Sequence, residues 1–449
     1  MNKDIVCIGA GYIGGPTMAV IAAKNPGRKV YVVDVSAERI AAWNSDDLPI
    51  YEPGLSEVVK QVRGKNLFFS TDIDGAIRKC DIIFVGVNTP TKTFGRGAGR
   101  ASNLQYWESA ARNISRVANR DKIVIEKSTL PVRTAEAMAK VLAAHPKHKF
   151  TVLSNPEFLA EGTAIRDLLE PDRVLIGGPR TREGERAVKA LVDIYAAWVP
   201  RERIVTTNLW SSELTKLAAN AMLAQRVSSV NALSALCEVT GADVDEVAHV
   251  MGMDGRIGPR FLKAGPGFGG SCFKKDVLNL VYLCESYGLK PAADYWNQVI
   301  LMNEWQQERI VTRMLDEMFH TISGKKIAVF GFAFKADTGD TRETPSLHVI
   351  DMLMEERARV CVTDPKAIPN ARQDLAHYGD AIVYEEDPYK AAKDADAVVV
   401  MTDWKEFAEL NWRKIRRAMR TPAFVYDTRN CLDVPLLRKL GFTVLSVGK

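Results

Sequence analysis

The stretch DIVCIGAGYIGGPTMAVIAAK, residues 4–24, decides the fold of the first half of the chain. A short apolar run leads into the glycine pattern GAGYIG at 9–14, and an apolar segment with helical character follows it. A second apolar run, KVYVVD at 29–34, ends in Asp34, twenty residues beyond the last of these glycines. This order predicts a strand, a tight turn, a helix and a second, parallel strand.

Glycines and an aspartate at this spacing are typical of a Rossmann dinucleotide site. Gly9 would allow the tight turn, Gly11 would let the backbone approach a pyrophosphate, and Gly14 would permit close helix packing. Asp34 would accept hydrogen bonds from a ribose diol and repel a 2′-phosphate, which favours NAD over NADP, although the nearby Arg39 weakens this preference. The alternative is a glycine-rich turn without a ligand.

Strand-like and helical segments alternate in two parts of the chain. The first part ends near residue 205, and the second begins at Lys325, where KKIAVFGFAF, ARVCVTDP and DADAVVVMTDW repeat the order of KDIVCIGAGY, RKVYVVDV and KCDIIFVGVNTP. Continuous apolar strands alternating with helices indicate parallel sheets covered on both faces. The sequence therefore predicts an α/β protein with two Rossmann-like, doubly wound domains. The second lacks the full glycine pattern and need not bind the same ligand.

Between these halves the sequence is helical. Residues 210–240 contain neither proline nor glycine, and their small and apolar residues recur at three and four positions, which predicts one helix of about 30 residues. Such a helix is ~45 Å long, so we expect it to join domains or to form a subunit interface. We predict a dinucleotide-binding domain at 1–208, a central helical domain at 209–323 and a C-terminal Rossmann-like domain at 324–449.

Composition narrows the class of protein. The 449 residues are 47% hydrophobic and 26% charged, with a formal net charge of +5 and no long basic run, which argues against a nucleic-acid partner. Seven scattered cysteines without a CxxC pair argue against a disulfide framework and a metal site and favour a reducing compartment. The beginning, MNKDIVCIGAGY, lacks the organisation of a signal peptide, and no apolar run is long enough for a membrane span. We expect a cytoplasmic protein that does not bind membranes.

The stretch GFGGSCFKKD, residues 267–276, carries a candidate nucleophile. Cys272 follows a glycine-rich turn and would lie in the first turn of a helix, where the helix dipole, Lys274 and Lys275 favour a thiolate. Asp276 would share its helical face. A thiolate can add to an aldehyde, oxidation of the adduct beside a nicotinamide gives a thioester, and water then releases an acid. The alternative is a small buried cysteine beside a surface charge.

Two further pairs of polar residues have a catalytic and an ordinary interpretation. Lys216 and Asn220, within ELTKLAANAMLA, lie one turn apart on the long helix and could both point at an oxyanion, or they could form an exposed polar stripe. Glu157 and Glu161, within SNPEFLAEGTA, could act in catalysis or could be the acidic residues common at a helix start.

These stretches resemble, over nearly the whole chain and in the same order, the UDP-glucose 6-dehydrogenase branch of the UDP-glucose/GDP-mannose dehydrogenase family. The stretches that carry the resemblance are GAGYIGGPT, VNTPTKTFG, EKST, NPEFLAEGTA, ELTKLAANA, GMDGRIG, FLKAGPGFGGSCFKKD and FGFAFKADTGDTRETPS. Two of them, VNTPTKTFG and FGFAFKADTGDTRE, look closest to the animal and plant members.

The resemblance implies an NAD-dependent, four-electron oxidation of UDP-glucose to UDP-glucuronate, with two NAD reduced and a thiohemiacetal and a thioester formed on Cys272. It also implies a homo-oligomer built from dimers, a dimer or a hexamer, in which Arg256 reaches the site of a neighbouring subunit. The C-terminal domain would bind the UDP portion.

The family's site residues can be carried over by position. The catalytic residues implied are the nucleophile Cys272, the oxyanion and proton-handling residues Lys216, Asn220 and Asp276, the acid–base Glu157, and Thr129 near the reacting centre. The cofactor-binding residues implied are Gly9, Ala10, Gly11, Tyr12, Ile13, Gly14, Asp34, Arg39, Val87, Asn88, Thr89, Pro90, Thr91, Ser128, Thr129, Leu130, Glu161, Cys272 and Arg342. The substrate-binding residues implied are Glu157, Phe158, Leu159, Ala160, Glu161, Lys216, Asn220, Arg256, Lys263, Gly267, Phe268, Gly269, Phe334, Lys335 and Arg429.

Three competing functions remain at this point. A sister enzyme could act on GDP-mannose or UDP-N-acetylmannosamine, although Phe273 and the preceding FGGS favour UDP-glucose. A simple dehydrogenase could transfer one hydride and use Cys272 only structurally, which predicts one NADH for each substrate. A silent nucleotide-sugar sensor would bind without turnover, although the intact Cys272, Lys216 and Asp276 argue against it.

Overall fold

The computed structural model describes residues 4–144 and 147–449, so the first three residues of the strand-like beginning lie outside it. The chain divides into two compact units, Met1–Ala219 and Asn220–Lys449, and each is described by itself. Among the described residues, no helix combines the length and the apolar character needed to cross a membrane.

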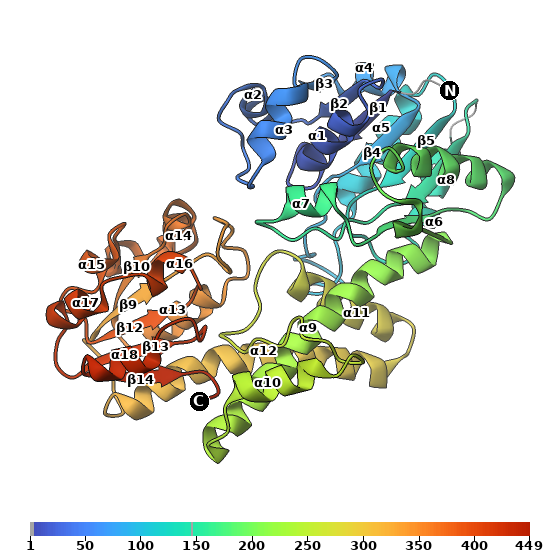
Figure 1. The fold of residues 1–449 in the computed structure, drawn as a ribbon. Coiled ribbons are helices and arrows are strands. Elements are labelled where there is room, and N and C mark those ends of the chain that lie inside the picture. The colour runs from blue at the N-terminus through green and yellow to red at the C-terminus, as the bar shows by residue number, and fades with distance from the viewer. Residues whose placement is uncertain (1–3, 145–146) are drawn as a thin grey trace. The chain divides into compact units, whose positions relative to one another are not determined.

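The first unit is built on an eight-stranded sheet in the order β3-β2-β1-β4-β5-β6-β7-β8 (Figure 1). Its strands are β1 Ile5–Ile8, β2 Val30–Val33, β3 Leu67–Ser70, β4 Ile82–Val85, β5 Lys122–Glu126, β6 Phe150–Ser154, β7 Val174–Gly177 and β8 Ile204–Thr207. Its helices are α1 Gly14–Lys24, α2 Ala37–Asn44, α3 Leu55–Val62, α4 Ile73–Lys79, α5 Gln105–Val117, α6 Thr134–Ala143, α7 Ala164–Leu169 and α8 Arg182–Tyr195.

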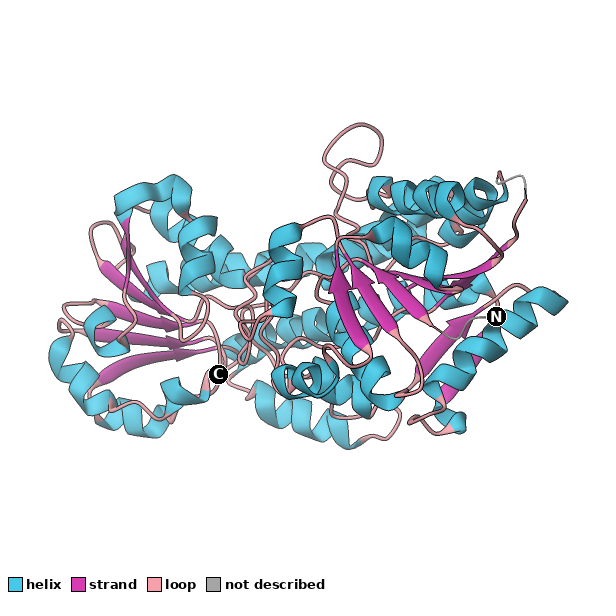
Figure 2. Cartoon of the chain, turned by 90° about the horizontal axis from the view of Figure 1, so that it is seen from above, coloured by secondary structure: helices cyan, strands magenta, loops and turns pink. Residues whose placement is uncertain are grey.

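Both faces of this sheet are buried, as the continuous apolar strands predicted. In β1 the side chains of Ile5 and Cys7 join one apolar cluster, whereas Val6 and Ile8 join another on the opposite face. Figure 2 shows helices on both sides of the strands. The six strands β3-β2-β1-β4-β5-β6 are parallel, with Cys7 beside Val32 and Phe84. The fold class predicted for this half is confirmed.

One strand pair departs from the all-parallel prediction. Strand β7 runs antiparallel to β6 and pairs with it only through Ser154 and Gly177, and β8 then runs parallel to β7. The connection from β6 to β7 contains only the six-residue helix α7. Six helical residues rise about 9 Å, too little to recross the sheet as a parallel connection does, so the chain returns in the opposite direction.

The long helix predicted at 210–240 is confirmed as α9, Leu209–Thr240. Its 32 residues rise about 48 Å. Gly241 follows its last residue, and the φ of +76° at this glycine suits the left-handed position after a helix. The other helices of the central region are α10 Val244–Met253, α11 Phe273–Ser286 and α12 Lys290–Glu317. Val277 of α11 and Val299 of α12 pack in one apolar cluster with Ala221 and Ala224 of α9.

The second sheet repeats the topology of the first. Its order, β11-β10-β9-β12-β13-β14, corresponds strand by strand to β3-β2-β1-β4-β5-β6, which confirms the two related halves. Its strands are β9 Lys326–Phe330, β10 Arg359–Thr363, β11 Ile382–Tyr384, β12 Ala397–Val400, β13 Ala423–Asp427 and β14 Phe442–Ser446. Its helices are α13 Pro345–Glu355, α14 Ile368–Asp374, α15 Pro388–Ala391, α16 Lys405–Ala408, α17 Trp412–Ala418 and α18 Val434–Lys439.

Candidate active site

The glycine-rich turn after β1 is closed on the protein side and open on the other. Gly9 has a φ of +109°, and a Cβ there would lie 2.5 Å from the carbonyl oxygen of Gly86. A Cβ on Gly14 would lie 2.0 Å from the carbonyl oxygen of Gly9, whereas one on Gly11 would meet nothing within 4 Å. The open position beside the start of α1 is where a pyrophosphate needs access to backbone N–H groups. The residues present therefore fit a dinucleotide.

Asp34 directly follows β2, and its carboxylate is fixed by backbone hydrogen bonds. Its carboxylate accepts hydrogen bonds from the backbone N–H groups of Ala10, at 2.8 Å, and Ser36, at 2.9 Å. Arg39 lies 3.2 Å from the same carboxylate, and its side chain is 47% exposed. Arg39 is thus paired with Asp34 and is less able to bind a 2′-phosphate than the sequence alone indicated. The structure therefore weakens the objection that Arg39 raised to NAD.

Most of the other predicted cofactor residues of this unit follow β4, which is next to β1 in the sheet, and β5, which is next to β4. The Ser128 hydroxyl donates to the Val87 carbonyl at 2.6 Å, and the Thr89 hydroxyl donates to the Thr129 carbonyl at 3.2 Å. The structure thus brings the 87–91 and 128–130 segments together at the carboxyl edge of the sheet, where open α/β sheets bind ligands. Leu130 is buried in the apolar cluster on one face.

Glu157 and Lys216 form a buried ion pair. Lys216 Nζ lies 3.1 Å from Glu157 Oε1, and both side chains are about 5% exposed or less. Burial raises the pKa of Glu157, but Lys216 and the N–H of Leu159, which donates at 2.7 Å, outweigh it and hold that pKa below its ordinary value. The ammonium also lies over the ring of Phe158, 5.5 Å from its centre. The interpretation of Lys216 as part of an exposed polar stripe is therefore wrong.

The loop that carries Glu157 and Glu161 has an anchor that sequence reasoning missed. Both carboxylate oxygens of Glu52 accept hydrogen bonds from it, one from Gly162 N at 2.6 Å and one from Ala164 N at 3.1 Å. The Ala160 N–H donates to Asp167 at 3.0 Å. Glu52 lies over a hundred residues earlier in a loop, so no local pattern indicated this contact.

A second missed residue, Lys127, is buried close to Glu157. Its ammonium donates to Asn155 at 3.2 Å and to the Tyr195 hydroxyl at 3.3 Å. Burial lowers the pKa of Lys127 to about 8, against the opposing influence of Glu157. Two buried lysines therefore act on one glutamate. A lysine directly after an apolar strand, as in KIVIEKS, was the available signal.

In the second unit Cys272 is the N-cap residue of α11 and not a member of its first turn. Its carbonyl accepts the first helical hydrogen bond, from Asp276 N at 2.9 Å, while Phe273 is the first helical residue. The prediction was wrong by one position, because Gly270, at φ +84°, turns the chain just before the helix. The thiol is partly buried and lies 3.3 Å from the Ser271 hydroxyl.

Asp276 is buried and is not a surface charge. Its side chain is in the first turn of α11 and is 1% exposed, and Asn220 donates to its Oδ2 at 2.6 Å. Asn220 is itself buried on α9, one helical turn beyond Lys216. The structure thus pairs two of the predicted catalytic residues, and the surface-charge and polar-stripe interpretations of Asp276 and Asn220 are wrong.

The predicted sugar loop, residues 263–269, is held by buried polar residues of α9 and α12. Asn303 Oδ1 accepts from Phe268 N at 2.7 Å, and Asn303 Nδ2 donates to the Phe268 carbonyl at 3.1 Å. Gly265 N donates to Asn231 at 2.9 Å, and Gln306 donates to the Gly265 carbonyl at 2.8 Å. Polar residues at core positions of an otherwise apolar helix face were the sequence signal for these anchors.

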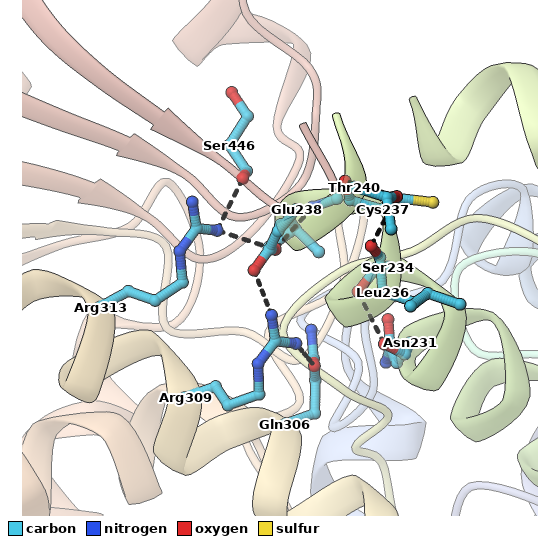
Figure 3. Close-up of polar contacts among 12 residues, drawn as sticks. Asn231, Ser234, Leu236, Cys237, Glu238, Thr240, Gln306, Arg309, Arg313 and Ser446 are labelled. Atoms are coloured by element: carbon cyan, nitrogen blue, oxygen red, sulfur yellow. Dashed lines mark hydrogen bonds and ion pairs between the residues drawn. The ribbon is translucent and has the colours of Figure 1, made fainter. Parts of the chain in front are cut away.

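Figure 3 shows how this support continues to the C-terminal strand. Arg309 donates to Gln306 at 2.6 Å and pairs with Glu238, whose carboxylate also lies 2.8 Å from Arg313. Glu238 accepts from Gly448 N at 2.8 Å, and Arg313 donates to the Ser446 carbonyl at 2.9 Å. One carboxylate therefore connects α9, α12 and the end of the chain.

Other predicted substrate residues of this unit gather near the ends of β9, β12 and β13. Arg429 donates to the carbonyls of Met401, at 2.7 Å, and Phe334, at 2.8 Å. Lys263 lies 3.0 Å from Asp403. Gly269 leaves room for Phe334, because a Cβ there would lie 2.9 Å from the Phe334 Cβ. Lys335 places its ammonium over the Phe334 ring.

The remaining predicted residues of this unit are two arginines. Arg342 pairs with Asp340, and its carbonyl accepts from Gly270 N at 2.9 Å. Arg256 pairs with Asp254 at 2.6 Å and is 90% exposed.

The second Rossmann-like half does not repeat the nucleotide site of the first. Asp364 occupies the position of Asp34, but its carboxylate accepts five bonds from its own chain, at 2.7 to 3.2 Å. The donors are the N–H groups of Phe332, Ala333, Lys366 and Ala367 and the indole of Trp404. A carboxylate has about four lone-pair sites, so none is left for a ribose. This agrees with the incomplete glycine pattern.

Known proteins match this chain over nearly its whole length. Residues 3–199, 210–305 and 328–434 match the NAD binding, central and UDP binding domains of the UDP-glucose/GDP-mannose dehydrogenase family. The chain is 58% identical to UDP-glucose 6-dehydrogenase 3 of Arabidopsis thaliana and to UDP-glucose 6-dehydrogenase 1 of Glycine max, over 99% of this chain and 97% of each relative.

Two solved structures have the same architecture. One is a UDP-glucose dehydrogenase of Pyrobaculum islandicum, with a TM-score of 0.85 and 32% identity over 98% of each chain. The other is a UDP-D-ManNAc dehydrogenase of Pyrococcus horikoshii, with a TM-score of 0.82 and 26% identity over 99% of each chain.

Proposed function

Because the chain belongs to the UDP-glucose/GDP-mannose dehydrogenase family, we propose that it oxidises UDP-glucose to UDP-glucuronate and reduces two NAD in doing so. The family relationship makes the chain an enzyme and NAD its cofactor. The observation that carries the finer proposal is Cys272, partly buried at the start of α11, with the buried Asp276 four residues on and hydrogen-bonded to Asn220 of α9. A single-hydride dehydrogenase needs no cysteine there.

The proposed chemistry proceeds in two oxidations. The C6 alcohol loses two electrons and becomes an aldehyde, and the Cys272 sulfur adds to its carbonyl carbon. Loss of two more electrons converts this thiohemiacetal into a thioester. Water then adds to the thioester carbon and the carbon–sulfur bond breaks, which releases the carboxylate and restores the thiol. When bound, NAD supplies the hydride acceptor in each oxidation.

The residues around the reacting carbon have distinct proposed roles. Lys216 is a buried cation and Asn220 a buried amide donor, so both suit an oxyanion in each tetrahedral species. Glu157 is ionised beside Lys216 and suits the acid–base role, while Asp276, through its bond to Asn220, holds that amide in place. The proposed role of Thr129 is to lie near the reacting centre, beside the cofactor segments.

Binding follows the same division. We assign the dinucleotide to the turn at 9–14, Asp34, and the 87–91 and 128–130 segments, and the UDP-sugar to the 263–269 loop, Arg429 and their neighbours. The domain boundaries proposed from sequence, 208/209 and 323/324, are supported by the gaps between the three family matches. A reducing, cytoplasmic location is supported by the absence of any disulfide among the seven cysteines, all of which are described.

A homo-oligomer is part of the proposal. Large apolar side chains of α9 are exposed along its length, including Met222 at 51%, Leu236 at 57% and Val239 at 81%. An apolar stripe of this kind fits a second copy of the chain. The exposed Arg256 is available to reach that copy. Mass determination in solution tests the assembly, and a monomer that turns over normally would contradict it.

The decisive experiment is the amount of NADH formed for each UDP-glucose under excess NAD. Two NADH for each sugar, with UDP-glucuronate as product, supports the full proposal. One NADH with an aldehyde product would assign the chain to single-hydride dehydrogenases. Turnover only with GDP-mannose or UDP-N-acetylmannosamine would assign it to a sister activity, and binding without turnover would indicate a sensor.

A further inference from the structure

A carboxyl group that accepts no hydrogen bond within the described part of the chain is buried at the end of β5. The side chain of Glu126 is 1% exposed, and neither of its oxygens accepts a hydrogen bond from any described residue. The ionisable group that acts on it is Glu213, in the second turn of α9, which is 3% exposed. Two ionised carboxylates in such a place would repel each other strongly, which favours one bound proton for the pair.

Glu213 already has donors of its own, from the start of α6. Its Oε2 accepts from Arg133 N at 2.7 Å, and its Oε1 accepts from Ala135 N at 2.8 Å. Arg133 is the N-cap residue of α6, with a φ of +74°, and its side chain makes no capping bond. Glu213 thus supplies the negative group that a helix N-terminus favours. This makes Glu213 the ionised member of the pair and Glu126 the protonated donor.

No cation compensates the pair within the described residues. Lys127, the residue directly after β5, points its ammonium at Asn155 and Tyr195. Arg133 directs its guanidinium to Glu136, and Lys216, on the same helix as Glu213, pairs with Glu157. Burial, and then the charge of Glu213, raise the pKa of Glu126 well above its ordinary value, and burial raises that of Glu213 against the opposing backbone donors.

We propose that Glu126 and Glu213 share one proton and act as positioning residues for the segment 128–132, whose Ser128, Thr129 and Leu130 are assigned to the cofactor. Glu126 directly precedes this segment, and Glu213 binds the backbone at its other end, at Arg133. With the proton present, both ends are fixed. Without it, the repulsion is relieved when the Glu213 carboxylate moves away from the end of β5. Because that carboxylate holds the backbone at Arg133, this movement displaces the segment. The inference rests on the proposed cofactor role of residues 128–130.

Isosteric variants of the full-length protein test this inference by NAD binding. Dissociation constants for NAD are measured without sugar, from neutrality to about pH 10. In the wild type, affinity is expected to fall on the order of 10-fold through a one-proton transition. Glu126→Gln always donates, so its affinity should equal the neutral wild type and lack the transition. Glu213→Gln places an amide N–H donor opposite a backbone N–H donor, so this variant should bind NAD more weakly at every pH.

The matched control is Glu136→Gln, which removes a partly exposed carboxylate from the same helix α6 and should keep the wild-type profile. Infrared spectroscopy of the wild type supplies a readout that needs no variant to fold. The carbonyl stretch of a protonated carboxylic acid should be present at neutral pH, disappear with the same midpoint as the NAD transition, and be missing in Glu126→Gln.

Three results would overturn the inference: no protonated-acid band in the wild type, the same alkaline transition in Glu126→Gln, or a titrating band with no change in NAD affinity. None of these measurements uses UDP-glucose. A chain that fails to oxidise UDP-glucose yet shows the Glu126-dependent transition would therefore contradict only the proposed function, and normal turnover without the band would contradict only this inference.

Discussion

Asn220 donates a 2.6 Å hydrogen bond to the buried carboxylate of Asp276, whose own N–H is bound to the carbonyl of Cys272. The amide is therefore fixed by a buried acceptor, and the carboxyl group of Asp276 lies one helical turn from Cys272. Such an arrangement orients a donor before the reaction starts, and preorganised donors are the usual source of oxyanion stabilisation.

Replacing Asn220 by Ala should lower kcat on the order of 10²-fold with little change in the KM for UDP-glucose, because a donor to the transition state is lost. Steady-state rates at saturating NAD measure this. Gln225→Ala removes an amide from a partly exposed position of the same helix, where it bonds Tyr295, and should leave kcat within about twofold. Equal losses in both variants would mean that Asn220 supports only the helix.

Cys272→Ser should stop the reaction before the acid. A serine hydroxyl is a much weaker nucleophile than a thiolate, and water opens an oxygen ester more slowly than a thioester. Acid formation should therefore fall by roughly 10³-fold or more. Product analysis by mass spectrometry, with NADH counted in a single turnover, follows each oxidation separately. Normal formation of UDP-glucuronate by this variant would exclude the covalent route.

Much of this architecture could be predicted from the sequence, because its strongest signals are periodic and local. Gly9 and Gly14 meet the local requirements of one turn, Asp34 follows at the spacing of one strand–helix–strand unit, and the helix at 209–240 follows from an uninterrupted pattern. The reversal of β7 could not be predicted in this way, since it depends on how far the short helix α7 carries the chain.

The candidate site divides in the same manner. Cys272 and Asp276 were recognisable from a helix start and a four-residue spacing. Glu52 was not, because it binds backbone groups more than a hundred residues away and lies in a loop without a pattern of its own. Asn231 and Gln306 are polar residues at core positions of helices, but that signal does not identify the distant backbone groups that they bind. The sharing of a proton by Glu126 and Glu213 likewise depends on tertiary burial.

Gly267→Ala should weaken sugar binding. Gly267 has a φ of +108°, and a Cβ there would lie 2.8 Å from the Asn303 oxygen that fixes Phe268. The loop must shift, so the KM for UDP-glucose should rise about 10-fold or more, while NAD binding to the other unit is retained. Gly27→Ala, at a position with open space around it, is the control. An unchanged KM would remove the 263–269 loop from the substrate site.

Lys127 should make unfolding depend on alkaline pH. Its pKa is lowered by burial to about 8 in the folded protein, against about 10.4 when unfolded, so the unfolded chain binds more protons between these values. The free energy of unfolding contributed by this group therefore rises from about pH 8 to about pH 10.4, by roughly 1–3 kcal/mol, and is lost again as the pH falls through 8.

The measurement is urea unfolding of the wild type and of Lys127→Met across this range. The difference between them should grow in favour of the wild type as the pH rises, while the contribution of Glu126, which has the opposite sign, cancels. Lys65→Met, at an exposed position, should give a difference that does not change with pH. A flat difference for Lys127→Met would show that the buried ammonium does not titrate there.

Glu238→Gln should destabilise the second unit and also reach the sugar loop. The carboxylate is 11% exposed and faces Arg309, Arg313 and Gly448 N, so its loss leaves two largely buried guanidinium groups without their anion. Breaking such a network costs about 3–5 kcal/mol. Because Arg309 also holds Gln306, which bonds the Gly265 carbonyl, the KM for UDP-glucose should rise severalfold while the affinity for NAD is unchanged.

Glu308→Gln, on the exposed face of α12, is the control and should alter neither stability nor KM. A loss of stability with an unaltered KM would separate the network of Figure 3 from the substrate loop and leave it a tether for the C-terminal strand.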